Sequence, residues 1–169
     1  MIDETLATPK TAPVEDALTV DTFDLEKWIN GVTPVERACT IYGRADLLAQ
    51  LDLMRDRIKA ARRAGKDTKS LEDQAQHLAD EVEASALDIV VQGWSPERRE
   101  EYHQALKDQG ITDNLELGLH MVAAQIVKPE GFTVEMLRTL QDVSPTQAGL
   151  IAARVQEANT KPVEVGVPF

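Results

Sequence analysis

Two stretches of regularly spaced apolar residues, between Arg44 and Ile89, constrain the fold of this chain more than any other feature. Their members recur at alternating intervals of three and four, which keeps one narrow apolar stripe on one side of a helix. The first stripe is Leu47, Leu51, Met54 and Ile58, and the second is Leu71, Ala75, Leu78, Val82, Ser85 and Ile89. The polar segment 65–69 can supply a turn, and Ser70 is a good N-cap for a second helix. We therefore predict an antiparallel helical hairpin.

Short runs of β-branched and other apolar residues flank this hairpin. Residues 37–42 precede it and residues 87–91 follow it, and a glycine ends each run. Runs of this length are typical either of a strand or of a buried helix end, and periodicity does not separate the two. Ile89 belongs both to the apolar stripe and to the second run. Because a hairpin brings its two ends together, we predict that the runs pair as a two-stranded ribbon at its base.

The rest of the chain has the signals of short helices. Asp24 caps a segment that contains Leu25, Trp28 and Ile29, and four further helix starts follow after residue 94. These starts are Ser95-Pro96, Asp113 or Asn114, Thr133, and Ser144-Pro145-Thr146-Gln147, the last of which reads as a capping box. The second of these helices carries one apolar stripe, formed by Leu115, Leu119, Val122, Ala123 and Ile126.

The predicted fold is therefore mainly α, with a projecting helical hairpin and a small C-terminal helical bundle. We expect a disordered N-terminal tail over residues 1–22, because these residues offer little apolar surface to bury. The short helix and the hairpin with its strand-like flanks occupy 23–93, and the helical bundle occupies 94–159. Residues 160–169 are expected to form a flexible C-terminal tail.

The overall charge narrows the classes of partner. A formal net charge of −11 and a pI near 4.7 argue against extensive binding to nucleic acid or to an anionic membrane, because both would repel the chain. The N-terminus is acidic and lacks the apolar core of a signal peptide, and no run reaches the roughly 18–20 apolar residues of a membrane helix. The single cysteine, Cys39, excludes an internal disulfide and suits a reducing cytosol.

No motif for catalysis is recognisable, so we expect no enzyme, cofactor or metal. Asp73, His77 and Glu81 would share one helix face as metal ligands would, but a solvated face with polar pairs explains the spacing better. Glu116 and His120 lack a third ligand at such spacing. Cys39 has no activating group nearby in the sequence and is expected to act as a small buried hydrophobe.

Basic residues gather in one part of this acidic chain, at the expected tip of the hairpin. A docking surface for an acidic partner and ordinary solubilising charge are both compatible with the cluster. Its members are Arg55, Arg57, Lys59, Arg62, Arg63, Lys66 and Lys69.

Several stretches of the chain resemble the tail assembly chaperones of long-tailed (siphovirus-type) actinobacterial phages. The resemblance starts with residues 23–29 (FDLEKWI) and residues 36–48 (ERACTIYGRADLL) and continues in the charged hairpin. Residues 94–102 (WSPERREEY), 120–124 (HMVAA), 133–137 (TVEML) and 167–169 (VPF) are also similar to the family, so that the resemblance spans most of the chain from residue 23.

This resemblance implies a non-enzymatic protein of the host cytoplasm that is not expected in the mature virion. It would keep the tape measure protein soluble while tail tube subunits polymerise around it. In many such phages a longer, frameshifted form carries an extra domain that recruits the tail tube protein, and this chain resembles the short form.

The family offers no binding residues to transfer, so the client site is a hypothesis from the residues. We expect an apolar groove near Leu119, Val122 and Ile126 to hold a helix of the client, and Arg55, Arg62, Arg63 and Lys66 to offer a second, basic contact surface. The alternative is a helical adaptor or structural protein that self-associates through its hairpin. A weaker alternative is a regulator that places the basic tip on nucleic acid.

Overall fold

The computed structural model describes residues 24–163. The expected tail over residues 1–22, and the expected C-terminal tail from residue 164 on, lie outside the described residues. The contacts divide the chain into one unit over Met1–Thr33 and a second over Pro34–Phe169. The described part of the first unit contains helix α1 (Leu25–Asn30), where the carboxylate of Asp24 accepts a hydrogen bond from the backbone N–H of Lys27 at 3.0 Å. The predicted cap is therefore confirmed.

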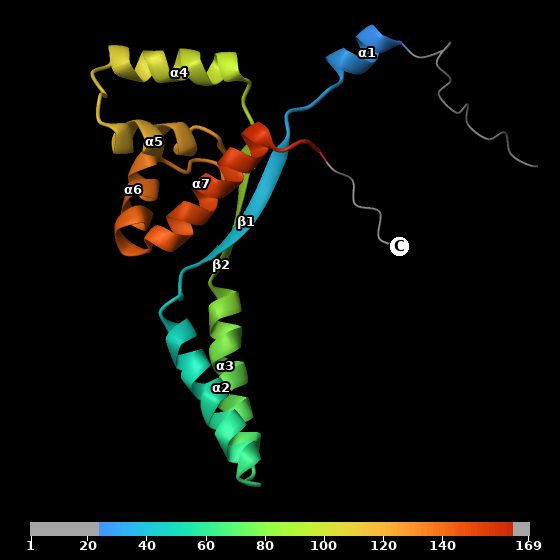
Figure 1. Cartoon of the computed structure of the whole chain (residues 1–169), viewed down its shortest axis with the longest axis vertical. Helices are drawn as coiled ribbons and strands as arrows, with labels where there is room; N and C mark the ends of the chain where they lie inside the picture. The colour runs from blue at the N-terminus through green and yellow to red at the C-terminus, as the bar shows by residue number, and fades with distance from the viewer. Residues whose placement is uncertain (1–23, 164–169) are drawn as a thin grey trace, which may run out of the picture. The chain divides into compact units, whose positions relative to one another are not determined.

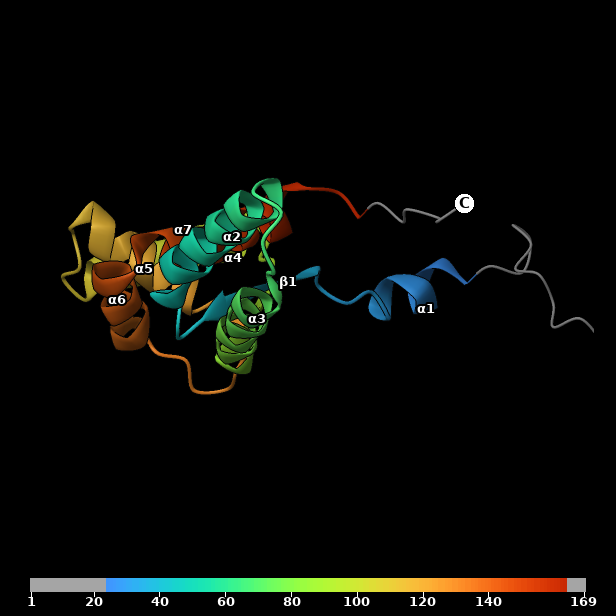
Figure 2. The same ribbon diagram turned by 90° about the horizontal axis from the view of Figure 1, so that it is seen from below.

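The second unit combines a long helical hairpin, a small antiparallel sheet and four further helices, which confirms the mainly α class (Figure 1). Figure 2, a view from below, shows the two hairpin helices side by side. In chain order the elements are β1 (Glu36–Tyr42), α2 (Leu47–Arg63), α3 (Lys69–Ala84), β2 (Ala86–Gln92), α4 (Pro96–Asp108), α5 (Asn114–Ala123), β3 (Ile126–Lys128), α6 (Val134–Val143) and α7 (Pro145–Thr160).

The hairpin of α2 and α3 packs its apolar stripes between its own two helices, where some members are buried and others, such as Met54 and Leu78, are partly buried. Leu51 and Ile58 of α2 and Val82 of α3 are each less than 10% exposed. The start of α3 differs from the prediction. The helix begins at Lys69, and its N-cap is Thr68, not Ser70. The Asp67 carboxylate accepts from the Lys69 N–H at 3.0 Å and thereby supplies the polar start of the helix.

The two runs that flank the hairpin pair as predicted. β1 and β2 are antiparallel, in a register that places Cys39 opposite Ile89 and Tyr42 opposite Ala86. Ile89 therefore belongs to a strand, and it is fully buried. The chain leaves the helical path at Ser85, the C-cap of α3, whose hydroxyl donates to the Val82 carbonyl at 2.6 Å.

A third strand was not foreseen, and the prediction of a two-stranded ribbon is corrected to a three-stranded sheet. β3 pairs antiparallel with β2, and the sheet order is β1-β2-β3. The last member of the predicted apolar stripe, Ile126, does not belong to the helix, since α5 ends at Ala123 and Ile126 starts β3. Ile126 and Val127 are β-branched, and Pro129 disfavours a helical conformation in the residue before it. Pairing with β2 then decides for a strand.

The core lies between the sheet and α7, which crosses one of its faces (Figure 1). α7 contributes buried residues at intervals of three and four, and the strands contribute alternate residues, as one covered sheet face requires. The core cluster consists of Cys39, Ile41, Ile89, Val91, Leu119, Ala123, Leu137, Ala148, Ile151, Val155 and Ala158. Hairpin flanks and bundle helices therefore share one core.

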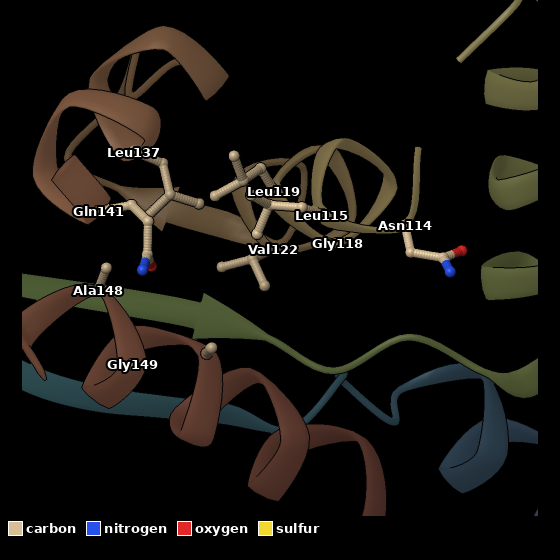
Figure 3. Close-up of a pocket in the computed structure, with 10 residues that line it drawn as sticks. Asn114, Leu115, Gly118, Leu119, Val122, Leu137, Gln141, Ala148 and Gly149 are labelled. Atoms are coloured by element: carbon tan, nitrogen blue, oxygen red, sulfur yellow. The ribbon is translucent and has the colours of Figure 1, made fainter. Parts of the chain in front are cut away.

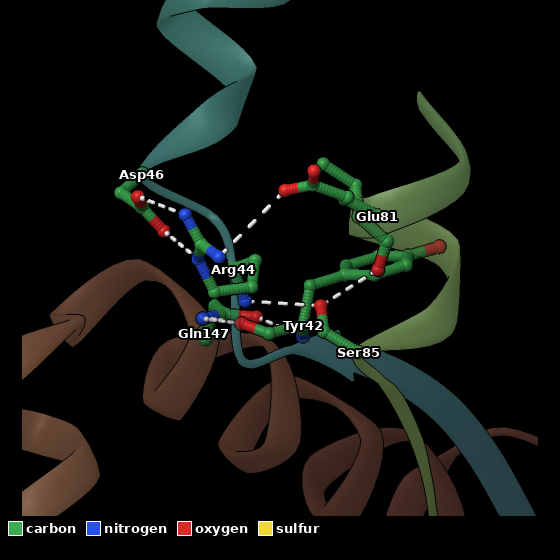
Figure 4. A network of polar contacts seen from close by, with 7 residues as sticks. Tyr42, Arg44, Asp46, Glu81, Ser85 and Gln147 are labelled. Atoms are coloured by element: carbon green, nitrogen blue, oxygen red, sulfur yellow. Dashed lines mark hydrogen bonds and ion pairs between the residues drawn. The ribbon is translucent and has the colours of Figure 1, made fainter. Parts of the chain in front are cut away.

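Polar contacts hold the junction between sheet, hairpin and α7 (Figure 4). The Arg44 backbone N–H donates to the Ser85 hydroxyl at 3.0 Å, and the Arg44 guanidinium lies 3.0 Å from Asp46 and 3.7 Å from Glu81. The Gln147 amide bonds to the Tyr42 backbone and donates to the Ser144 hydroxyl at 3.2 Å, and Ser144 makes no side-chain cap bond, so the predicted capping box does not form. The geometry at Tyr42 offers Gln147 both a donor and an acceptor at once.

Candidate functional site: an apolar groove between three helices

A groove of about 210 Å³ opens between α5, α6 and α7 (Figure 3). Leu119 and Leu137 form its buried base, and Leu115 lies at its exposed side with 61% of its surface accessible. The complete lining is Asn114, Leu115, Gly118, Leu119, Val122, Leu137, Gln141, Ala148, Gly149 and Ala152. The surface is therefore mainly apolar, with an amide side chain on α5 and another on α6.

Small residues keep this groove open. Gly118 on α5 faces a stretch of α7 that contains Ala148, Gly149 and Ala152. A Cβ atom added to Gly118 or to Gly149 would meet no other atom within 4 Å. Glycine inside a helix is destabilising by about 1 kcal/mol relative to alanine, so nothing in helix formation favours either residue here. The structural consequence of the two glycines is the open space of the groove.

An ion pair holds α5 and α6 together beside the groove. The guanidinium of Arg138 donates to both carboxylate oxygens of Glu116, at 3.1 Å from Nε and 2.6 Å from Nη2. This two-point contact lowers the pKa of Glu116 below its usual range and raises that of Arg138. Because both side chains are more than a third exposed, we expect the pair to fix the position of α6 relative to α5 more than to raise the stability of the fold.

The groove contains two of the three residues expected at a client site. Leu119 and Val122 line it, whereas Ile126 lies in β3 and packs against the core. Ile126 was placed with the others because a helix was expected to continue through it. The end of α5 at Ala123 removes it from their face.

Most of the groove lining was missed by sequence reasoning. Leu137 and Gln141 come from α6, and Ala148, Gly149 and Ala152 come from α7. The spacing of residues along the chain does not indicate that residues on three separate helices lie close together. The available signal was the presence of small residues within two apolar helices, which is typical of close helix packing as well as of a groove.

The predicted basic residues lie far along the hairpin, and their environments differ. Arg55 pairs with Asp52 at 3.3 Å, and Arg62 pairs with Glu72 of α3 at 2.9 Å. Arg63 and Lys66 make no ion pair within residues 24–163 and are exposed. The hairpin tip therefore keeps uncompensated positive charge.

The residues considered for catalysis or metal binding have ordinary structural roles. His77 lies 3.2 Å from Glu81 on an exposed face, and Glu116 is engaged by Arg138. Among the described residues no cluster of three or more His, Cys, Asp or Glu side chains could hold a metal ion. Cys39 is buried in the core, and this burial raises the pKa of its thiol.

A second hollow, beside α4, is lined by Trp94, Arg98, Glu101, Tyr102 and Ala124. The Arg98 guanidinium lies 4.3 Å above the Trp94 ring, and Tyr102 meets that ring edge-on with 5.3 Å between centroids. Because these side chains already satisfy one another, the apolar groove is the better candidate for a binding site.

Comparison with known proteins adds no further identification. Within the part of the chain that the structure describes, none of the helices is both long enough and apolar enough to span a bilayer. No protein-family model, curated protein or solved structure matches this chain.

Proposed function

We propose that this protein is a phage tail assembly chaperone that binds the tape measure protein and keeps it soluble while tail tube subunits assemble around it. The observation that carries the proposal is the open apolar groove between α5, α6 and α7. The resemblance of residues 23–29 and 36–48 to that chaperone family supports the same role. The protein would act without catalysis, in the host cytoplasm, and would be absent from the finished virion.

The shape and chemistry of the groove suit a helical client. An amphipathic helix binds by placing a few apolar side chains into a hydrophobic groove. The small residues on the α5 and α7 sides of this groove would let its backbone approach closely. Leu115 would be covered on binding, since it is the most exposed large apolar residue of the lining. The side-chain amides of Asn114 and Gln141 make no hydrogen bond within the described residues, so they are free to orient the client.

The alternative of a helical adaptor or structural protein that self-associates through the apolar seam of its hairpin has weaker support. Leu51, Ile58 and Val82 are buried inside the hairpin of a single chain, so the seam offers little apolar surface to another protein. A regulator that binds nucleic acid through its tip is disfavoured by the net charge of −11. Recruitment of the tail tube protein would belong to a longer, frameshifted form of the protein.

The test is co-expression with the tape measure protein, followed by pull-down and size-exclusion chromatography. Wild-type protein should keep the client soluble and elute with it in a large complex. The variant Gly118→Leu with Gly149→Leu fills the groove from two sides into open space, so it should fold normally and lose most of the soluble client. Ala153→Leu, at an exposed position of α7 outside the groove, is the matched control.

The outcomes separate the groove from the function. If wild type fails to solubilise the tape measure protein, the chaperone proposal is wrong. If wild type succeeds and the groove-filled variant succeeds equally, the client binds elsewhere on the protein. Val122→Asp is a useful second variant, provided that circular dichroism shows it folded.

A further inference from the structure

The hairpin carries opposite charges at its two ends. Seven basic and two acidic residues lie between positions 55 and 69, so this segment has a net charge of +5. The rest of the chain has a net charge of −16, which gives the total of −11. Between positions 70 and 96 there are six acidic residues and no lysine or arginine. Glu72 and Asp73 lie near the tip, and the other four, Asp80, Glu81, Glu83 and Asp88, lie toward the base. α2 is thus basic toward the tip, and α3 together with β2 is acidic.

Part of this charge is not compensated within the monomer. Arg57, Arg63, Lys66 and Lys69 make no side-chain ion pair among the described residues, and all four are exposed. At the base of the hairpin, Asp80 and Glu83 are exposed and likewise lack an ion pair within residues 24–163. Asp80 accepts only a hydrogen bond, from Gln76 at 2.7 Å.

The two ends of one hairpin are too far apart to neutralise each other. α3 has 16 residues, so it spans about 24 Å at 1.5 Å per residue. The Debye length is about 10 Å in 0.1 M salt, so charges at such a distance on exposed side chains are largely screened. A second hairpin that lies alongside in the reverse direction would bring tip and base into contact.

We propose that two copies of this chain associate through their hairpins, side by side and antiparallel, with the basic tip of each copy against the acidic base of the other. A two-fold axis perpendicular to the hairpins achieves this, because it reverses the direction of the second hairpin and makes the same tip-to-base contact twice. The self-complementary charge pattern selects a second copy over an unrelated acidic partner. This association is separate from the groove and needs no client.

Association that depends on exposed charges should be modest and sensitive to salt. Sedimentation velocity of the full chain is expected to show dimers in low salt, about 0.02 M, and monomers in high salt, about 0.5 M. A chain that remains monomeric in low salt at every concentration tested would overturn the proposal. A dimer that persists unchanged in high salt would do the same, since it would have to rest on other contacts.

Charge reversal gives the sharpest test. The tip variant Arg63→Glu with Lys66→Glu, and the base variant Asp80→Lys with Glu83→Lys, should each weaken self-association by about tenfold or more, because like charges then meet. Mixed together, the two variants should restore the dimer, since each reversed tip meets a reversed base. All four positions are exposed, so the variants are expected to fold as wild type does.

The matched control is Lys107→Glu with Lys128→Glu, which makes the same change in net charge at exposed positions outside the hairpin. It should dimerise like wild type. If this control is weakened as much as the tip variant, net charge alone governs association and the hairpin contact is refuted. Failure of the mixed variants to associate, with both folded by circular dichroism, would refute it as well.

Discussion

The side-chain amide of Gln147 binds both backbone polar groups of Tyr42, accepting from its N–H at 2.6 Å and donating to its carbonyl at 3.1 Å (Figure 4). Gln147 lies in the first turn of α7, and Tyr42 is the last residue of β1. The amide thus occupies the place that a neighbouring strand would take at the free side of β1. It ties the C-terminal helix to the point where the hairpin begins.

Loss of this contact should destabilise the protein measurably. Gln147→Ala leaves two partly buried backbone groups without partners, and we expect the free energy of unfolding to fall by about 1–3 kcal/mol. Gln147→Glu keeps the acceptor for the Tyr42 N–H but loses the donor, so its free energy of unfolding should fall less than that of Gln147→Ala. Urea denaturation followed by circular dichroism measures both. Gln141→Ala, which removes an amide without a hydrogen-bond partner among the described residues, should change little; equal losses for Gln141→Ala and Gln147→Ala would refute this role.

Close approach of two backbones at Gly93 predicts a second, larger effect. A Cβ atom at this position would lie 2.3 Å from the carbonyl oxygen of Ala158 and 2.9 Å from its carbon. Gly93→Ala must therefore push α7 away from the end of β2, and we expect a loss of about 2 kcal/mol or more. Gly149→Ala, whose new Cβ enters open space in a helix, should instead stabilise by about 0.5–1 kcal/mol. Thermal unfolding of the two variants should give shifts of opposite sign.

The stability of the C-terminal helix should depend on pH through Glu157. Lys161 and Arg154 donate hydrogen bonds to its carboxylate and lower its pKa from 4.5 to about 2. A carboxyl group whose pKa is lower in the folded state contributes stability that is fully present above about pH 4.5 and is lost as the pH falls toward about 2.

The measurement is urea denaturation of wild type and Glu157→Gln across that range. The difference between the two proteins should be largest near neutral pH and should shrink as the pH falls from about 5 to about 2. Glu116, whose pKa is also lowered, is expected to act with the same sign through Arg138. A difference that stays constant with pH would contradict the assignment for Glu157.

Alanine substitutions at two isoleucines should show that the hairpin can open independently of the core. Ile151 is fully buried against the sheet, so Ile151→Ala should cost about 2–5 kcal/mol of global stability. Ile58 is 9% exposed and packs within the hairpin, outside the core cluster. Ile58→Ala should accelerate amide hydrogen exchange mainly in α2 and α3 and leave the exchange of β2 and α7 nearly unchanged. Equal acceleration in all four elements would mean that the hairpin unfolds only with the core.

The regular spacing of apolar residues and the capping residues were enough to predict the hairpin, the paired strands at its base and most helix starts. Each of these depends on residues close in sequence: Leu51 and Ile58 lie on one face because of the helical period, and Asp113 caps α5 because its carboxylate reaches the Glu116 N–H three residues on. Ile89 was ambiguous for the same reason, since a local pattern fitted both a helix and a strand.

Tertiary structure decided what depends on neighbours distant in the chain. Ile126 became part of a strand because β2 offered it a free edge. The Gln147 amide still donates to the Ser144 hydroxyl, but it does not form the expected cap because the Tyr42 backbone offers it both a donor and an acceptor. The groove arises in the same way, from Gly118, Leu137 and Gly149 on three helices. Local periodicity records only which face a residue occupies, whereas the packing of one face on another settles what that face contacts.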